Sequence, residues 1–329
     1  MSMTALSDGF ARKTPPGHRV TLGSAREIWA DRRRVLERRG RIANPDGQRL
    51  DWDSRIFSLA VLGFGWAMRL FGLYGRGRRN ALSPALVERE FVFRDLPAVF
   101  DGYRILQISD PHLDCLPGLA EIARDLIAGV AVDLVAVTGD ICGKRHASLM
   151  AATEPLAALL AGAKVRDRVV AVLGNHDPSM MAEALEQHGI TTLLNESLTI
   201  ERGRDRLVLT GLDDVHRFYT PAATAALSAA PHGFRVALVH SAEIADHAAA
   251  AGFGLYLCGH THGGQICLPG GRSVFSHLRR CKFGIRGEWR AGPMIGYTSN
   301  GLGVGEVPLR FNCRGEIAMI TLRRGATGD

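Results

Sequence analysis

The chain has 329 residues, and 46% of them are hydrophobic, which is enough for a large domain with an appendage and excludes wholesale disorder. The formal net charge of +7 is unevenly distributed. Residues 1–104 contain 19 Lys and Arg residues against 11 Asp and Glu residues, whereas the remainder contains 21 against 22. The six cysteines form no CxxC pair, which excludes a small disulfide framework. The excess positive charge therefore belongs to the N-terminal third, and the rest lacks the basic charge typical of nucleic-acid binding.

A basic helix is expected near the N-terminus. Ser24 as N-cap and Glu27 three residues later form a capping-box pattern. Apolar residues then recur at helical spacing, opposite a series of arginines: Ala25, Ile28, Trp29 and Leu36 against Arg32, Arg33, Arg34, Arg38 and Arg39. Such a basic amphipathic helix is typical of a membrane surface and equally of a solvated protein surface.

A nearly continuous apolar segment, IFSLAVLGFGWAMRLFGLY, follows at residues 56–74. It is marginal for a bilayer, which requires about 20 apolar residues, and Arg69 at mid-membrane would cost roughly 2.5–3.5 kcal/mol. We therefore expect an interfacial or shallow hairpin anchor on an anionic membrane surface, peripheral or monotopic at the cytoplasmic face. A single span and a buried or partner-binding helix are the alternatives. Residues 1–94 are then a helical, membrane-associating extension.

Residues 95–329 show the pattern of an α/β domain. Short apolar runs predict strands at 104–109, 133–138, 168–174, 206–212, 235–240 and 254–259. Ala- and Leu-rich stretches between them predict helices at 117–130, 147–162, 180–188, 220–229 and 242–250. Two further strands, 294–300 and 316–323, follow each other without a helix, so the sheets are mixed. Either two packed sheets or one large mixed sheet fits this order.

Polar residues follow five of these strands. They are Asp110 and His112, then Asp140, then Asn175, His176 and Asp177, then His240, and finally His260 and His262. Each motif alone is explained by a turn, a helix cap or a solvent-exposed loop. Because α/β sheets place their sites at the carboxyl ends of strands, the five ends together predict one common site.

The residue types at these strand ends indicate metal binding. Carboxylate, amide oxygen and imidazole without thiolate suit manganese, iron or zinc, of which we prefer manganese. One carboxylate, such as that of Asp140, can bridge two cations about 3.5–4 Å apart. Two such cations bind a phosphoryl group and make hydroxide available near neutral pH. The sequence therefore predicts a site with two divalent metal ions.

The series D-x-H, G-D, G-N-H-D, H and G-H-x-H resembles that of the calcineurin-like metallophosphoesterases, and the resemblance covers residues 95–323. GHTHGGQICLP (259–269) and YTSNGLGVGEVPLRFNCRGEI (297–317) resemble the branch of membrane-associated bacterial phosphodiesterases that includes a UDP-2,3-diacylglucosamine pyrophosphatase. The resemblance implies a four-layer sandwich of two mixed β-sheets flanked by helices.

The resemblance also implies a role for each polar residue. The first metal would be held by Asp110, His112 and His262, and the second by Asn175, His240 and His260, with Asp140 as the bridge. His176 would donate a proton to the leaving-group oxygen or stabilise the phosphoryl transition state, and Asp177 would orient it. Two positions depart from the family pattern: Gly143 replaces the second Asp of G-D-x-x-D, and Pro111 replaces a frequent Leu. Neither change removes a metal ligand.

We therefore expect hydrolysis of a phosphodiester or pyrophosphate bond in a phosphorylated small molecule or a lipid, such as a UDP-diacylglucosamine, at a membrane. One alternative is a metal-stabilised scaffold without hydrolytic activity, which has no need of His176. The other is a nuclease with the same chemistry, which the near-neutral catalytic region disfavours because polyanion binding requires a basic groove. The sequence indicates no oligomeric state.

Overall fold

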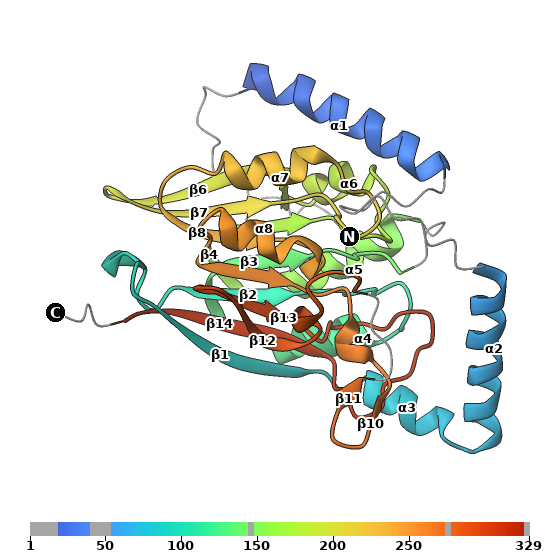
Figure 1. Ribbon diagram of the computed structural model, residues 1–329. Helices are drawn as coiled ribbons and strands as arrows, with labels where there is room; N and C mark the ends of the chain where they lie inside the picture. The colour runs from blue at the N-terminus through green and yellow to red at the C-terminus, as the bar shows by residue number, and fades with distance from the viewer. Residues whose placement is uncertain (1–18, 40–53, 144–147, 274–277, 326–329) are drawn as a thin grey trace, which may run out of the picture.

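The computed structural model describes residues 19–39, 54–143, 148–273 and 278–325 (Figure 1). Two six-stranded sheets dominate it. Ile105, Val170, Leu209 and Leu257, from both sheets, belong to one buried apolar cluster, so the sheets pack face to face. Two further clusters join the outer face of each sheet to its own helices. The predicted sandwich of two mixed sheets flanked by helices is confirmed.

The first sheet has the strand order β1-β14-β2-β3-β4-β5. Its strands are β1 (Ala85–Phe93), β14 (Glu316–Arg324), β2 (Arg104–Ile108), β3 (Ala131–Thr138), β4 (Lys164–Val172) and β5 (Thr191–Thr192). Only the β14–β2 pair is antiparallel. Because β2, β3 and β4 run parallel, their carboxyl ends meet at the same edge of the sheet.

The second sheet has the strand order β12-β13-β9-β8-β7-β6. Its strands are β12 (Gly287–Ala291), β13 (Met294–Thr298), β9 (Leu255–Cys258), β8 (Phe234–Leu238), β7 (Asp205–Gly211) and β6 (Glu196–Arg202). The four central strands run parallel, and β12 and β6 close the two edges in antiparallel pairs. The sheet is therefore mixed, as predicted.

The helices that cover the sheets lie where the sequence predicts them. The first sheet is covered by α4 (Leu119–Leu126), α5 (Met150–Leu160) and α6 (Met181–Gln187), and the second by α7 (Pro221–Ser228) and α8 (Ala245–Ala250). The remaining elements are short: η1 (Ala98–Phe100), η2 (Ala242–Ile244), η3 (His262–Gly264), η4 (Lys282–Gly284), β10 (Cys267–Leu268) and β11 (Arg272–Ser273).

The described part of the N-terminal third contains three helices: α1 (Arg19–Arg39), α2 (Ser54–Leu70) and α3 (Tyr74–Ala81). The N-cap prediction for Ser24 is wrong, because α1 begins at Arg19 and Ser24 lies inside it. The apolar segment 56–74 is divided between α2 and α3 by a turn in which Gly72 has φ +68°. Across the described residues, we find no helix whose length and apolar character would let it span a membrane. The division at residue 94 stays a prediction, although β1, which precedes it, belongs to the first sheet.

The core between the sheets generates a stability prediction. Leu209 on β7 is fully buried in that core, whereas Leu62 on α2 is 61% exposed. We expect Leu209→Ala to lower the free energy of unfolding by about 2–5 kcal/mol, because it leaves a cavity between the sheets. The matched variant Leu62→Ala should change it by about 0.5 kcal/mol or less. Urea denaturation followed by circular dichroism measures both, and equal effects would contradict the assignment of the core.

Candidate metal centre

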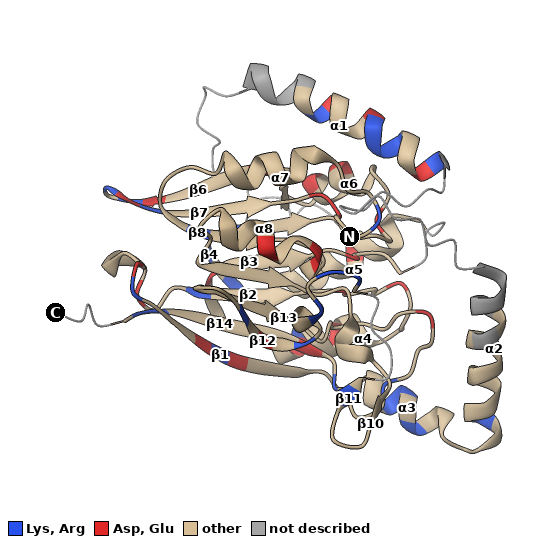
Figure 2. Ribbon diagram, in the orientation of Figure 1, with Lys and Arg blue, Asp and Glu red and all other residues tan. Residues whose placement is uncertain are grey.

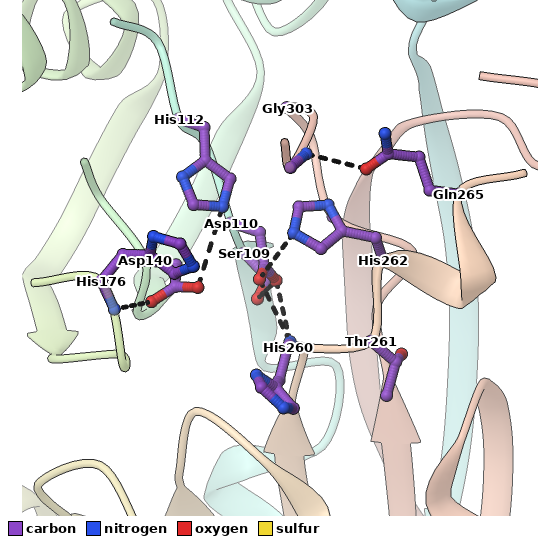
Figure 3. Close-up of polar contacts among 12 residues, drawn as sticks. Ser109, Asp110, His112, Asp140, His176, His260, Thr261, His262, Gln265 and Gly303 are labelled. Carbon is purple, nitrogen blue, oxygen red and sulfur yellow. Dashed lines mark hydrogen bonds and ion pairs between the residues drawn. The ribbon is translucent and has the colours of Figure 1, made fainter. Parts of the chain in front are cut away.

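The polar residues predicted from the strand ends lie close together, and Figure 3 shows among them Asp110, His112, Asp140, His176, His260 and His262. Two groups of candidate ligand atoms, each within 4.8 Å of one another, are formed by Asp110, His112 and His262 and by Asp140, His240 and His260. Asn175 joins the second group, since its Oδ1 lies 3.2 Å from His240 Nε2. The structure therefore brings all seven predicted ligands together.

In the first group, Asp110 is fully buried. Its carboxylate accepts a hydrogen bond from Ser109 Oγ at 2.6 Å and another from the His260 backbone N–H at 3.0 Å. His262 Nε2 lies 3.4 Å from Asp110 Oδ1, and the His112 ring is stacked on the His262 ring with centroids 5.2 Å apart. These contacts fix Asp110 while its Oδ1 faces the histidines.

In the second group, Asp140 lies between the histidines of both groups. Its Oδ2 is 3.3 Å from His240 Nε2 and 3.8 Å from His112 Nε2. Its Oδ1 accepts the backbone N–H of His176 at 2.8 Å. One carboxylate thus faces both groups, which is the position that a bridging ligand requires.

The hydrogen bonds of two histidines test whether these residues fit cations. His112 and His240 place Nδ1 2.9 Å from the carbonyl oxygens of Cys142 and Thr138, so Nδ1–H is the donor in each ring. A neutral ring then has a lone pair on Nε2, the tautomer that metal-ligating histidines use. His112 Nε2 faces Asp140 Oδ2 at 3.8 Å and is buried without a hydrogen-bond partner among the described residues, so a lone pair there faces a carboxylate. His240 Nε2 lies 3.3 Å from the same oxygen atom. A cation satisfies a lone pair and a carboxylate that face each other, so the residues fit the metal ions.

Burial shifts the pKa of these groups in directions that depend on their neighbours. It lowers the pKa of His112 to about 4 and that of His262 below its usual range, so both rings are neutral and keep a lone pair. It raises the pKa of Asp110 to about 6. Burial also acts to lower the pKa of His240, but the adjacent Asp140 carboxylate raises it to about 10. A concentration of buried charge of this kind is typical of functional sites.

The backbone is unusual at the same residues. Five of the seven candidate ligands have positive φ: Asp110 (47°), His112 (39°), Asp140 (52°), His260 (71°) and His262 (51°). Non-glycine residues rarely adopt this conformation, which concentrates at functional sites because the surrounding structure must stabilise it. The surrounding sandwich therefore holds these residues in a backbone conformation that they would not prefer by themselves.

The two other predicted site residues, His176 and Asp177, lie in the loop after β4. His176 Nδ1 is 3.2 Å from Gly143 O, and its ring centroid is 5.5 Å from that of His112. The Asp177 carboxylate accepts the backbone N–H groups of Gly174 at 2.8 Å and Cys142 at 3.0 Å. Asp177 thus fixes the backbone of the loop, and no hydrogen bond to the His176 ring is found within the described ranges.

Gly143 has a steric explanation. A Cβ at this position would lie 2.2 Å from Cys115 Sγ and 3.1 Å from His112 Nδ1. The space that an Asp side chain would need is therefore occupied, and the backbone N–H of Gly143 donates instead to Asp114 Oδ1 at 2.8 Å.

Sequence reasoning did not identify a further histidine beside the site. The His216 ring lies against the His260 ring at a tilt of 44°, with centroids 4.2 Å apart, and His216 Nδ1 lies 3.0 Å from Glu243 Oε1. A signal was present, because the segment Asp213-Asp214-Val-His216 follows the predicted strand 206–212 in the same way as the five motifs follow theirs.

Comparisons with known proteins agree with this geometry. Residues 103–264 match the family model of the calcineurin-like phosphoesterases. The uncharacterized metallophosphoesterase YkuE of Bacillus subtilis is 28% identical over 270 residues, which cover 76% of this chain and 90% of YkuE. The phosphodiesterase YaeI of Escherichia coli is 28% identical over 240 residues, which cover 70% of this chain and 84% of YaeI. A transmembrane protein with metallophosphoesterase domain from Danio rerio is 27% identical over 273 residues, 74% of this chain but 58% of that protein.

Residues 103–264 therefore belong to a calcineurin-like phosphoesterase domain, and the chain is a metal-dependent phosphoesterase. The match begins at the strand that carries Asp110 and ends just beyond His262, so it contains all seven candidate ligands.

The close packing around Asp110 generates a prediction. A Cβ on Gly259 would lie 1.9 Å from Ser109 Oγ and 2.2 Å from Asp110 Oδ2. We expect Gly259→Ala to displace both groups and to weaken metal binding by about 10–100-fold, as loss of a ligand's supporting contacts does. Metal content after dialysis, measured by mass spectrometry, checks this. The control Gly65→Ala, whose Cβ would meet only Arg69 Nη1 at 3.4 Å, should bind metal like the wild type.

Proposed function

We propose that this chain hydrolyses a phosphodiester or pyrophosphate bond by means of two divalent cations, on a substrate that is associated with a membrane. The observation that carries the proposal is the convergence of buried acceptor atoms from five strand ends. Bound there, two cations would polarise the phosphoryl group and make hydroxide available near neutral pH. Manganese is preferred, with iron and zinc as alternatives, because the donors are nitrogen and oxygen atoms.

The proposed ligands follow from the two groups. Asp110, His112 and His262 would hold the first cation, and Asn175, His240 and His260 would hold the second. Asp140 would bridge them, as the position of its Oδ2 between His112 Nε2 and His240 Nε2 supports. Ser109 Oγ and the carbonyl oxygens of Cys142 and Thr138 would orient these ligands.

His176 is the proposed proton donor or phosphoryl-binding group. Its backbone N–H is held by Asp140, and the contact between Nδ1 and Gly143 O leaves Nε2 as the ring nitrogen available to a substrate. From this position His176 would protonate the leaving-group oxygen or stabilise the charge on the phosphoryl group. Asp177 would support this role by fixing the loop backbone on either side of the ring.

The surface of α2 and α3 supports a membrane-associated substrate. Apolar side chains on α2 and in the turn that follows are largely exposed: Leu59 67%, Leu62 61%, Trp66 72%, Leu70 83% and Phe71 71%. The exposed arginines Arg76, Arg78 and Arg79 follow on α3 (Figure 2). Apolar and basic side chains side by side are typical of an interfacial anchor on anionic lipid. The Danio rerio relative is named as a transmembrane protein, which agrees with membrane attachment.

The proposed anchor lies close to the metal centre. Arg310 connects them, because its backbone N–H donates to Gly77 O of α3 at 3.0 Å and its Nη1 donates to His262 O at 3.4 Å. A lipid held at α2 and α3 would thus have its phosphoryl headgroup near the site. A phosphorylated lipid such as a UDP-diacylglucosamine fits this arrangement, and attachment would be peripheral or monotopic at the cytoplasmic face.

The hydrolytic site is tested by two variants with different expected defects. We expect Asp140→Ala to lose manganese binding and turnover of an aryl phosphodiester together, because Asp140 faces both ligand groups. His176→Ala should bind manganese but lower kcat by about 10²–10⁴-fold, the usual contribution of a positioned proton donor. Calorimetric titration and steady-state kinetics measure these effects. The control is His247→Ala, a half-buried histidine on α8 outside the two ligand groups, and undiminished turnover in both site variants would contradict the mechanism.

The membrane anchor is tested with vesicles. We expect the double variant Trp66→Ala/Leu70→Ala to bind phosphatidylglycerol-containing vesicles about tenfold more weakly or worse, because each lost CH₂ removes about 0.8 kcal/mol of apolar burial. Turnover of the water-soluble aryl phosphodiester should not change. The matched control Val92→Ala/Val99→Ala removes exposed apolar groups outside α2 and α3, at 57% and 54% exposure, and should bind vesicles like the wild type. Equal vesicle binding by all three proteins would exclude the anchor.

A further inference from the structure

Helix α1 is docked on the phosphoesterase domain through one of its faces (Figure 1). Arg26, Trp29, Arg33 and Glu37 recur every three or four residues and each contacts the domain. Arg26 Nη2 donates to Thr192 O at 2.9 Å, Trp29 Nε1 donates to Asp213 Oδ2 at 2.7 Å, and Glu37 Oε1 accepts the Ser179 N–H at 2.7 Å. The sequence predicts Arg33 on the basic face of this helix, at a membrane or in solvent. That prediction is wrong, because the side chain is buried against the domain.

Arg33 is the centre of this docked face. Its side chain is fully buried and forms an ion pair with Asp213. Its guanidinium lies 3.5 Å from the centroid of the Phe218 ring. Nη2 donates to two backbone carbonyl oxygens, Gly174 O at 3.1 Å and Asp177 O at 2.8 Å. A buried guanidinium needs such partners, and here the partners are the two ends of a single four-residue loop.

The two residues between those carbonyls are Asn175 and His176. Asn175 Oδ1 is 3.2 Å from His240 Nε2, and the His176 N–H donates to Asp140 Oδ1. The Asp177 carboxylate holds the loop from within the domain, through the N–H groups of Gly174 and Cys142. Arg33 holds the same loop by its carbonyl oxygens from the side of α1. Two side chains therefore fix the loop: the Asp177 carboxylate accepts from backbone N–H groups, and the Arg33 guanidinium donates to backbone carbonyl oxygens.

We propose that Arg33 is a positioning residue of the metal centre, which sets Asn175 and His176 in place and makes α1 a necessary part of the active site. The proposal rests on the proposed function, since Asn175 matters as a ligand of the second cation. It assigns a role at the reaction centre to a helix that precedes the matched residues 103–264.

The geometry of arginine explains why another cation would not replace it. A planar guanidinium offers several donors in fixed directions, and Arg33 uses them on Asp213 and on both carbonyls. A lysine ammonium could still pair with Asp213 but could not span all three acceptors in this plane. Arg33→Lys therefore preserves the charge and removes the bridge, which separates positioning from simple charge neutralisation.

The test uses the full chain with four substitutions. Arg33→Ala and Arg33→Lys remove the bridge between Gly174 O and Asp177 O. Arg26→Ala removes contacts with Glu186 and Thr192, which dock α1 without touching the loop. Arg34→Ala removes an exposed arginine of the same helix that bonds Asp31 and Ala30 O. Manganese binding to metal-stripped protein is measured by calorimetry, and backbone hydrogen exchange across residues 174–177 is measured in the absence of metal.

We expect both Arg33 variants to weaken one of two manganese-binding steps by about 10–100-fold and to leave the other unchanged, as loss of a group that orients a ligand does. kcat for the aryl phosphodiester should fall while KM changes little. Exchange at residues 174–177 should be faster in both variants. Arg34→Ala and Arg26→Ala should match the wild type in manganese affinity and in exchange at this loop, although Arg26→Ala lowers the melting temperature.

Three results would overturn the proposal: wild-type manganese binding by Arg33→Ala, full rescue by lysine, or an equal loss in Arg26→Ala, which would assign the effect to docking of the whole helix. Failure of the proposed function is a separate result, in which the wild-type chain itself does not bind two manganese ions. In that case the metal-free exchange at residues 174–177 still decides whether Arg33 fixes the loop.

Discussion

The structure depends on one constraint: acceptor atoms that would repel one another are buried together at the edge where the two sheets meet. Asp110 and Asp140 are nearly inaccessible to solvent, and the neutral ring of His112 directs its Nε2 lone pair toward Asp140. Burying unpaired charge is costly, so such a cluster is stable only when cations or precise hydrogen bonds offset the desolvation. The backbone is left-handed at five of the ligands, which allows their side chains to converge. Gly174 and Gly259 leave room for the aspartates, because a Cβ at either position would lie within 2.2 Å of an aspartate oxygen.

The sandwich supplies the rigidity that this cluster needs, and two buried arginines connect it to the rest of the chain. Arg33 bonds the carbonyl oxygens at both ends of the loop that carries Asn175 and His176. On the side of the first ligand group, Arg310 bonds the carbonyl oxygens of Gly301, Gly303 and His262, while Gly303 N–H donates to Asp110 O. Guanidinium groups suit this task because several donors diverge from one plane. Each ligand group therefore has its own buried arginine, from opposite ends of the sequence.

The sequence predicted what depends on local pattern. The strands and helices of the domain follow from apolar periodicity, and all seven candidate ligands were found because each follows a strand directly. The edge strands β1 and β6 were missed because their exposed positions interrupt the apolar pattern. Arg33 could not be recognised, because it stands between Arg32 and Arg34 and its burial is decided by Asp213, which lies 180 residues later in the chain. Side-chain pairs that are distant in sequence leave no local signal, whether they form a buried ion pair or a ring contact such as that of His216 with His260.

The docking of α1 on the domain determines which basic residues of the N-terminal third remain available to a membrane. Arg33 and Arg26 are engaged by the domain, so the proposed membrane attachment is assigned to α2 and to the exposed arginines of α3. The same third then reaches the metal centre twice: α1 contacts the loop of Asn175 and His176, and α3 contacts Arg310, which bonds His262 O. If α2 and α3 lie on a membrane as proposed, attachment and ligand geometry share one set of covalently connected helices. With the proposed role of Arg33, the extension is a structural part of the proposed active site, which would explain why its sequence carries buried polar contacts that a simple tether would not need.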